Sequence, residues 1–197
     1  MIEYIQGEVA ELYPAQLIME CAGVGYCLHI SLTTYSAFNG LLKGKIYVHE
    51  VIREDAHLLF GFATREEREL FLLLNSVSGV GSNTARLILS SLPPAELTQV
   101  IASGNDTALT TIKGIGHKTA QRIIIDLKNK VRTVEGAVER GKHVASPIRN
   151  ETIEGAVAAL VMLGFQKMAS RKAVDTILKQ TPQANVEKII KDALKIL

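Results

Sequence analysis

The spacing of apolar residues changes once along the chain, near residue 63. Before that point, short runs alternate apolar and polar side chains, as in Tyr4–Val9 and Lys45–Ile52, which is the period of a half-buried strand. Turn-forming glycine and proline residues separate the runs. Roughly five or six such strands in about sixty residues are typical of an OB-type barrel. We therefore predict a small β-barrel over residues 1–63.

From Thr64 onward the apolar residues recur every three to four positions, which is the spacing of an amphipathic helix. Thr64 is expected to cap the first helix, with Glu67 completing a capping box. Pro94 is expected at the first turn of a later helix, where proline is tolerated. Helices are predicted as far as Arg132. The pattern therefore predicts an all-α domain over residues 64–133.

The last third of the chain begins with a stretch of different composition. Residues 134–150 combine glycine, serine, proline and charged residues without an apolar face, which is typical of a flexible linker. Three helices are then predicted over residues 151–163, 167–180 and 185–197. The unit over 151–197 is close to the lower size limit for a domain. The predicted fold class is therefore α+β, with several domains.

A ten-residue motif occurs twice within the predicted all-α domain. Ser76–Ala85 and Thr111–Ala120 share both glycines, a threonine and an alanine, with a β-branched residue between the glycines. Glycine lets the chain turn sharply, and the first amides of the following helix favour an anion. Two copies therefore predict two phosphate-binding turns, whereas a single copy would equally fit two closely packed helices. The predicted phosphate-binding residues are Gly79, Val80, Gly81, Ser82, Asn83, Thr84, Gly114, Ile115, Gly116, His117, Lys118, Thr119 and Arg122.

The two copies differ in charge. His117 and Lys118 follow the second glycine of the second copy, and Arg122 lies one helical turn beyond Lys118. The first copy has the neutral Ser82 and Asn83 at the same places. We therefore expect the second copy to contribute more to affinity and to its salt dependence. No set of base-reading side chains is evident, so recognition should depend on shape and not on sequence.

Charge is unevenly distributed along the chain. The formal net charge is +2, but residues 1–62 hold three Lys/Arg against seven Asp/Glu, and residues 63–133 hold nine against six. The glycine motifs thus lie in a basic part of the chain, as a DNA-binding surface requires. Glu54 and Asp55 occupy a predicted hairpin tip in the acidic part. Acidic residues in turns are usually only solvated.

Signatures of catalysis, metal binding and membrane insertion are not evident. Gly40–Lys45 has the wrong spacing for a phosphate loop and is predicted to be a hairpin turn. The five histidines and two cysteines do not occur at metal-ligand spacing. No apolar run reaches the length of a membrane span, and the N-terminus does not resemble a signal peptide. We therefore predict a cytoplasmic protein without a metal or cofactor.

Several of these features resemble one known family. Val51–Phe62 resembles the hairpin of the RuvA family, the Holliday-junction-recognition subunits of the bacterial RuvAB branch-migration complex. Gly23–Tyr26 and the two glycine motifs, which are helix-hairpin-helix motifs in that family, follow the same order. Barrel, tandem repeat, linker and small helical domain together cover essentially the whole chain. One departure is Asn83, where family members often carry lysine.

The resemblance implies a non-catalytic subunit that acts in homologous recombination and DNA repair. It implies a homotetramer, or an octamer, that holds an open four-way junction on a basic face. Glu54 and Asp55 match the acidic pin of the family, which lies at the junction centre and helps to part the strands. The hexameric motor RuvB would supply ATP hydrolysis, and the RuvC resolvase would join a larger complex.

The C-terminal helices would match the domain that docks on the motor. We assign that contact to Leu160, Leu163 and Phe165. The alternative is that these apolar residues form the core of the three-helix unit, because so small a domain needs them.

Two other classes of protein remain open from the residues alone. A helix-hairpin-helix glycosylase or lyase would use Asp126, but this residue lies in a predicted helix without a partnering lysine. A single-strand binder would need aromatic residues for base stacking. The chain has five Phe, five Tyr and no Trp, many at inward strand positions, so this alternative is weakly supported.

Overall fold

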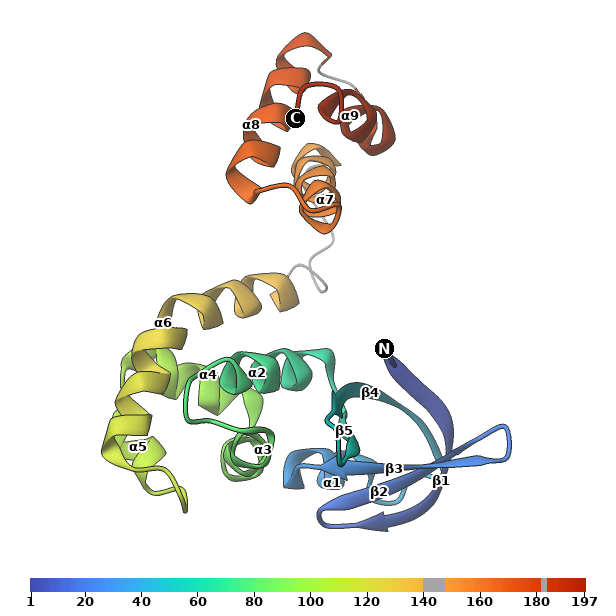
Figure 1. Cartoon of the computed structure of the whole chain (residues 1–197), viewed down its shortest axis with the longest axis vertical. Helices are drawn as coiled ribbons and strands as arrows, with labels where there is room; N and C mark the ends of the chain where they lie inside the picture. Colours follow the sequence, from blue (N-terminus) through green and yellow to red (C-terminus); the bar gives the residue numbers. More distant parts are fainter. Residues whose placement is uncertain (140–147, 182–183) are drawn as a thin grey trace. The chain divides into compact units, whose positions relative to one another are not determined.

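The computed structural model describes residues 1–139, 148–181 and 184–197 of the 197-residue chain (Figure 1). The chain divides into two units, Met1–Lys142 and His143–Leu197. Among the described residues, no helix is long and apolar enough to cross a membrane.

Within residues 1–62, five strands close into a barrel in the order β1-β2-β3-β5-β4. Neighbouring strands are antiparallel except β3 and β5, which are parallel. Alternate side chains point inward, so that Leu17 and Met19 of β2 are fully buried with Leu28 of β3. The predicted OB-type barrel is confirmed. Its strands are β1 (Tyr4–Tyr13), β2 (Gln16–Cys21), β3 (Val24–Ile30), β4 (Lys43–Ile52) and β5 (His57–Phe62).

A short helix that was not predicted, α1 (Leu32–Phe38), lies between β3 and β4. Ser31 caps it, because the Ser31 Oγ accepts a hydrogen bond from the Thr34 backbone N–H at 3.0 Å. Gly40, at φ +82°, follows the helix. The prediction of a hairpin turn over Gly40–Lys45 was therefore wrong: the segment leads from α1 into β4. A seven-residue helix is too short for its apolar spacing to be recognised.

Two of the five helices that the structure describes between the barrel and residue 139 begin where Thr64 and Pro94 predict. The Thr64 Oγ1 accepts a hydrogen bond from the Glu67 N–H at 3.1 Å, and Pro94 is the first residue of its helix. The Asn105 Oδ1 caps another helix by accepting from the Ala108 N–H at 3.1 Å. These helices are α2 (Arg65–Asn75), α3 (Ser82–Ser91), α4 (Pro94–Ser103), α5 (Asp106–Thr110) and α6 (His117–Glu139).

The barrel and the helices share one hydrophobic core. The rings of Phe60 and Phe62 in β5 lie 5.2 Å and 4.8 Å from the ring of Phe71 in α2, measured between centroids. The same cluster continues to Leu127 and Val131 of α6. The two domains predicted on either side of residue 63 are therefore packed into a single compact unit.

Helix α6 is longer than predicted. It continues through residues 134–139, and α7 (Ile148–Met162) begins before the predicted residue 151. Both ends of the linker predicted over residues 134–150 are thus helical. A single glycine such as Gly136 costs a helix only about 1 kcal/mol relative to alanine, so it did not end α6. The rest of the predicted linker, residues 140–147, lies outside the described residues.

The second unit contains three helices in its described residues: α7, α8 (Lys167–Gln180) and α9 (Val186–Ala193). The bounds of α8 match the prediction. Gly164, at φ +99°, follows α7. The buried side chains that these helices share include Ala156, Leu160, Val174, Ile177 and Ile189.

Candidate nucleic-acid interface

Each glycine motif forms a tight turn between two helices, and both turns have the same hydrogen bond. In the first turn, the Val80 N–H donates to the Val77 carbonyl at 3.0 Å. In the second, the Ile115 N–H donates to the Ile112 carbonyl, also at 3.0 Å. All four side chains are buried. The sequence repeat is therefore a structural repeat, in which apolar residues anchor each turn in the core.

The glycines of both turns face open space. Gly79 and Gly114 have φ values of +92° and +89°, a region that favours glycine. A Cβ atom added to Gly81 or Gly116 would have no neighbour within 4 Å. Gly81 is the N-cap residue of α3, and no side chain forms a capping hydrogen bond there. A phosphate can therefore approach the backbone at these turns without obstruction.

The second turn carries exposed basic side chains. Lys118 and His117 are both exposed, and the His117 Nδ1 lies 3.5 Å from the Asp106 Oδ2. Arg122 is exposed as well, but its Nη1 donates to the Ser78 carbonyl in the first turn at 3.3 Å. The predicted charge of the second turn is thus present on the surface. Arg122 additionally connects the two turns.

The side chains of the first turn offer less to an anion. Ser82 is only 8% exposed, and its Oγ lies 3.4 Å from the Asn75 Oδ1. Its hydroxyl is therefore largely covered, and Ser82 stays a predicted phosphate-binding residue through its backbone N–H. Asn83 is exposed and neutral. Arg86 donates to the Ala15 carbonyl of the barrel at 3.0 Å, and burial lowers the pKa of its guanidinium.

Two further predicted contact residues, Thr84 and Thr119, are the equivalent positions of the two copies. Both are partly buried. The alanines that follow them, Ala85 and Ala120, are fully buried. Their backbone N–H groups donate to the carbonyl oxygens of Gly81 and Gly116, at 2.9 Å in each case. The threonines therefore lie at the edge of each turn, while the alanines hold its helix against the core.

A cation–aromatic cluster on the barrel was not predicted. The Lys45 Nζ lies 3.8 Å from the ring centroid of Tyr4 and 5.2 Å from that of Tyr47. The guanidinium carbons of Arg65 and Arg68 each lie 5.6 Å from the Tyr47 centroid. Contacts of this kind are favourable because the cation faces the negative surface of the ring. Strand pairing and α2 bring these residues together from distant positions, which no local motif reveals.

The acidic hairpin is the turn between β4 and β5. The Arg53 N–H donates to the Ala56 carbonyl at 2.8 Å and closes it. Glu54 and Asp55 are exposed at its tip, as predicted. Within the part of the chain that the structure describes, neither carboxylate forms an ion pair. The tip therefore presents two carboxylates that are not neutralised by an ion pair.

The base of this hairpin is attached to the N-terminal segment. The Glu50 Oε2 accepts a hydrogen bond from the Ile2 N–H at 2.8 Å, and the Glu50 Oε1 lies 3.2 Å from the His57 Nε2. The hydrogen bond from Ile2 is the main reason why the pKa of Glu50 is lowered. The charge at the base is thus paired, unlike the charges at the tip.

Comparison with known proteins covers nearly the whole chain. Residues 1–61 match the RuvA N terminal domain, residues 71–129 the SAM-like Helix-hairpin-helix tandem, and residues 153–197 the RuvA, C-terminal domain. The chain is 64% identical over 198 residues to the Holliday junction branch migration complex subunit RuvA of Parabacteroides distasonis, with 100% of both chains covered. The chain belongs to the RuvA family.

Other members of the RuvA family give the same result. Identity is 55% over 201 residues to the subunit of Bacteroides thetaiotaomicron and 51% over 202 residues to that of Porphyromonas gingivalis. Both comparisons cover 100% of each chain. The similarity therefore includes the barrel, the tandem repeat and the C-terminal helices together.

The residues assigned to the motor contact differ in exposure. Leu160 is fully buried in the core of the C-terminal unit, and Phe165 is partly buried against it. Leu163 is 59% exposed, and its neighbours Val161 and Met162 are exposed too. Leu160 therefore has the alternative role that the sequence left open, as a core residue. Leu163 is the assigned residue that a partner can reach.

The alternative of a RuvA-unrelated repair enzyme is not favoured. Asp126, its nominated catalytic residue, is an exposed side chain on α6. Full-length identity to branch migration subunits extends over this helix.

Proposed function

We propose that this chain is the subunit of a branch migration complex that recognises Holliday junctions and holds them open. The observation that carries the proposal is the pair of matched turns with open glycines, in a chain similar over its full length to RuvA subunits. The Val80 and Ile115 N–H groups already donate within their turns, so the other backbone amides of the turns bind phosphate oxygens. Lys118 adds charge at the second turn. Such contacts fix the position of DNA without reading its sequence.

Preference for a four-way junction comes from assembly. One subunit offers two phosphate-binding turns, the two glycine turns, and any duplex can bind to them. Four subunits in a homotetramer present these turns to the four arms of the junction. The tips of their acidic hairpins, with Glu54 and Asp55, then lie near the crossover. Carboxylates repel phosphates, so the tips exclude a continuous duplex and favour separated strands at the centre.

The subunit itself is non-catalytic, and a RuvB motor supplies ATP hydrolysis. The exposed Leu163 with Val161 and Met162 forms the surface that contacts the motor, since exposed apolar groups of this kind mark protein interfaces. A RuvC resolvase then acts on the same junction. The complex works in the cytoplasm, in DNA recombination and repair.

A competition between DNA forms tests the proposal. The full chain should bind a synthetic four-way junction far more tightly than linear duplex of equal length, with affinity that falls as salt is raised. Mass measurement with and without the junction should give a tetramer or an octamer. Equal affinity for both DNAs would exclude junction recognition. Base release or strand cleavage in damaged duplex without added metal would favour the repair enzyme.

A further inference from the structure

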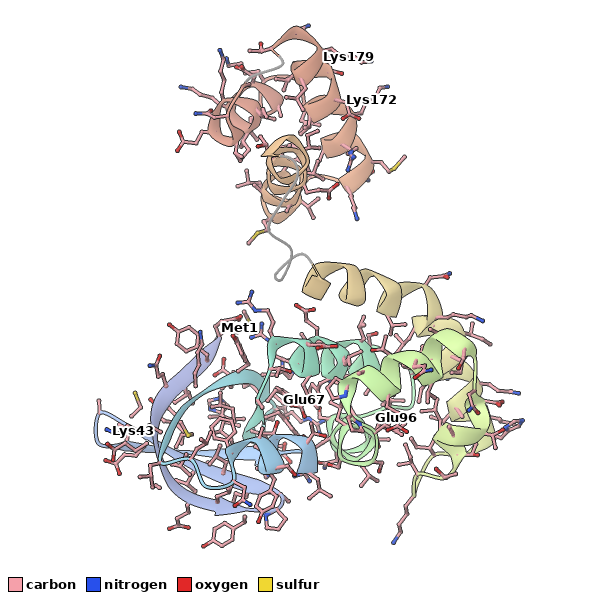
Figure 2. All side chains as sticks on the ribbon, turned by 180° about the vertical axis from the view of Figure 1, so that it is seen from behind. Met1, Lys43, Glu67, Glu96, Lys172 and Lys179 are labelled. Atoms are coloured by element: carbon pink, nitrogen blue, oxygen red, sulfur yellow. The ribbon has the colours of Figure 1, made fainter. Side chains whose placement is uncertain are left out.

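A buried carboxylate lies where the barrel meets the helices. Glu67 of α2 is 1% exposed and is the one carboxylate among the buried residues of the described chain. Its Oε1 accepts a hydrogen bond from the Ser31 Oγ, and its Oε2 accepts one from the Thr34 Oγ1 at 2.7 Å. The Ala63 N–H lies 3.3 Å from the Oε2 and 3.0 Å from the Thr34 Oγ1. Figure 2 shows Glu67 between the strands and the helices.

These partners come from three different places along the barrel part of the chain. Ser31 directly follows β3, and Thr34 belongs to α1. Ala63 directly follows β5, the parallel neighbour of β3. One side chain of α2 therefore holds the ends of two barrel strands. We call Glu67, Ser31, Thr34 and Ala63 the joint.

The joint lies between the two parts of the DNA interface. From Ala63, β5 runs back to the acidic hairpin, a distance of roughly 20 Å at about 3.3 Å per residue. From Glu67, α2 runs forward to the first glycine turn. A change of about 10° in the angle between β5 and α2 would displace the hairpin tip by roughly 3 Å on this length. The joint is therefore one of the contacts that hold Glu54 and Asp55 in place relative to the glycine turns.

Other contacts also cross from barrel to helices. The phenylalanine core of β5 and α2 is one, and Arg68 of α2 pairs with Glu3 at 2.6 Å. The Thr33 Oγ1 donates to the Leu89 carbonyl at 2.8 Å. Apolar packing has little directional preference, and the Arg68 pair involves an exposed carboxylate. A buried carboxylate is different, because it is stable only where its donors reach it.

We propose that Glu67 is a positioning residue for junction recognition, which fixes the acidic hairpin relative to the glycine turns through Ser31, Thr34 and Ala63. This inference rests on the proposed function. Glu67 cannot contact DNA itself, since it is buried. Its effect on DNA binding must therefore act through the hairpin and appear as a loss of selectivity.

Glu67→Gln in the full chain, with Glu66→Gln as control, tests the inference. Both substitutions replace a carboxyl group by an amide in the same turn of α2, but Glu66 is outside the joint and partly exposed. Affinities for a four-way junction and for linear duplex are measured together with the assembly mass. A fluorescent base analogue at the crossover reports strand separation. Glu67→Gln should lower the junction-to-duplex ratio roughly three- to thirtyfold, the range of effects from remote positioning residues.

Duplex affinity should match that of Glu66→Gln, because each glycine turn stays intact. The crossover fluorescence should fall in Glu67→Gln alone. An unchanged ratio in a folded, correctly assembled Glu67→Gln protein would overturn the inference, as would equal losses for both DNAs. If Glu67→Gln fails to fold, it is replaced by Thr34→Val, which removes the donor to Glu67 and the acceptor for the Ala63 N–H. An unchanged ratio in that variant overturns the inference. If neither wild type nor Glu66→Gln prefers the junction over duplex, the result contradicts the proposed function instead.

Discussion

The guanidinium of Arg122 joins the two glycine turns, because its Nη1 donates to the Ser78 carbonyl at 3.3 Å. The two residues are 44 positions apart in the sequence. The first turn has little charge of its own, since Asn83 is neutral and the hydroxyl of Ser82 is buried. Arg122 therefore brings a positive charge next to the first turn and links the two turns by a hydrogen bond.

This contact predicts that Arg122 and Lys118 differ in effect. Lys118→Gln should reduce the slope of log affinity against log salt by about one, because one phosphate contact is lost. Arg122→Gln should reduce it similarly, while Arg122→Ala should weaken binding further, because alanine also lacks a donor for Ser78. Fluorescence anisotropy over a range of salt measures both quantities. Lys179→Gln on α8, which removes the same charge from another unit, serves as control and should match wild type.

The open space beside Gly81 and Gly116 predicts that alanine substitutions there weaken DNA binding but leave folding nearly unchanged. Alanine at either position has no steric conflict in the free protein, so stability should change by less than about 1 kcal/mol. The added methyl group would occupy the approach of the phosphate, and affinity for every DNA form should fall. Gly116→Ala should lower DNA affinity more than Gly81→Ala does, since the second turn carries Lys118.

Gly79→Ala and Gly114→Ala are the contrasting variants. Both positions have positive φ, so alanine should destabilise the fold itself. Thermal melting and junction titrations of all four variants distinguish the two effects. Junction affinity that is unchanged in Gly81→Ala and Gly116→Ala would mean that phosphates bind elsewhere.

The unpaired tip of the acidic hairpin predicts a gain of affinity on neutralisation. One unit charge repels another by about 1 kcal/mol at 4 Å in water, so Glu54→Gln with Asp55→Asn should strengthen binding to linear duplex several-fold. Junction affinity should change less, and branch migration driven by the motor should change in rate. Gel-shift titrations and a branch migration assay test this. Weaker binding to all DNA forms would contradict the repulsion argument.

The burial of Glu67 predicts a pH dependence of stability. Burial raises the pKa of Glu67 above its ordinary 4.5, although the hydrogen bonds from Ser31, Thr34 and Ala63 oppose this change. The folded protein then holds this proton more tightly than the unfolded chain. The stability that Glu67 contributes is therefore complete below about pH 4.5 and is lost as the pH rises through the folded-state pKa.

Urea unfolding from about pH 4.5 to about pH 7 measures this effect. The difference in unfolding free energy between wild type and Glu67→Gln should become less favourable to wild type as the pH rises. Glu66→Gln serves as control for the loss of a charge. A difference that instead grows in favour of wild type with pH would mean that the hydrogen bonds outweigh burial.

Local patterns predicted the parts of this chain that depend on neighbouring residues. Apolar spacing predicted α8 over residues 167–180, and the repeated glycines predicted two equivalent turns. The contacts of the joint could not be predicted from neighbouring residues. The Glu67 N–H bonds to Thr64 as a capping box requires, but the carboxylate turns to Ser31, 36 residues away. The burial of that side chain is decided by the barrel, which no helical pattern contains.

The candidate site divides in the same way. Exposure of Glu54, Asp55 and Lys118 followed from turn and helix-start positions, whereas the burial of the Ser82 side chain did not. Ser82 follows a glycine as His117 does in the second copy, but its short side chain faces Asn75 of α2. The packing of preceding helices therefore makes two similar motifs chemically different.

The different exposure of Leu160 and Leu163 predicts opposite outcomes for two similar substitutions. Leu160 is fully buried, so Leu160→Ala should destabilise the C-terminal unit by roughly 2–5 kcal/mol. Leu163 is 59% exposed, so Leu163→Ala should change stability by less than about 0.5 kcal/mol. It should nevertheless weaken binding to a RuvB motor by about 1 kcal/mol or more, as an interface anchor does. Thermal unfolding and motor binding by the full chain are measured on both variants, with junction binding as the internal control. If Leu163→Ala binds the motor as wild type does, the motor contact lies on another surface of the C-terminal unit.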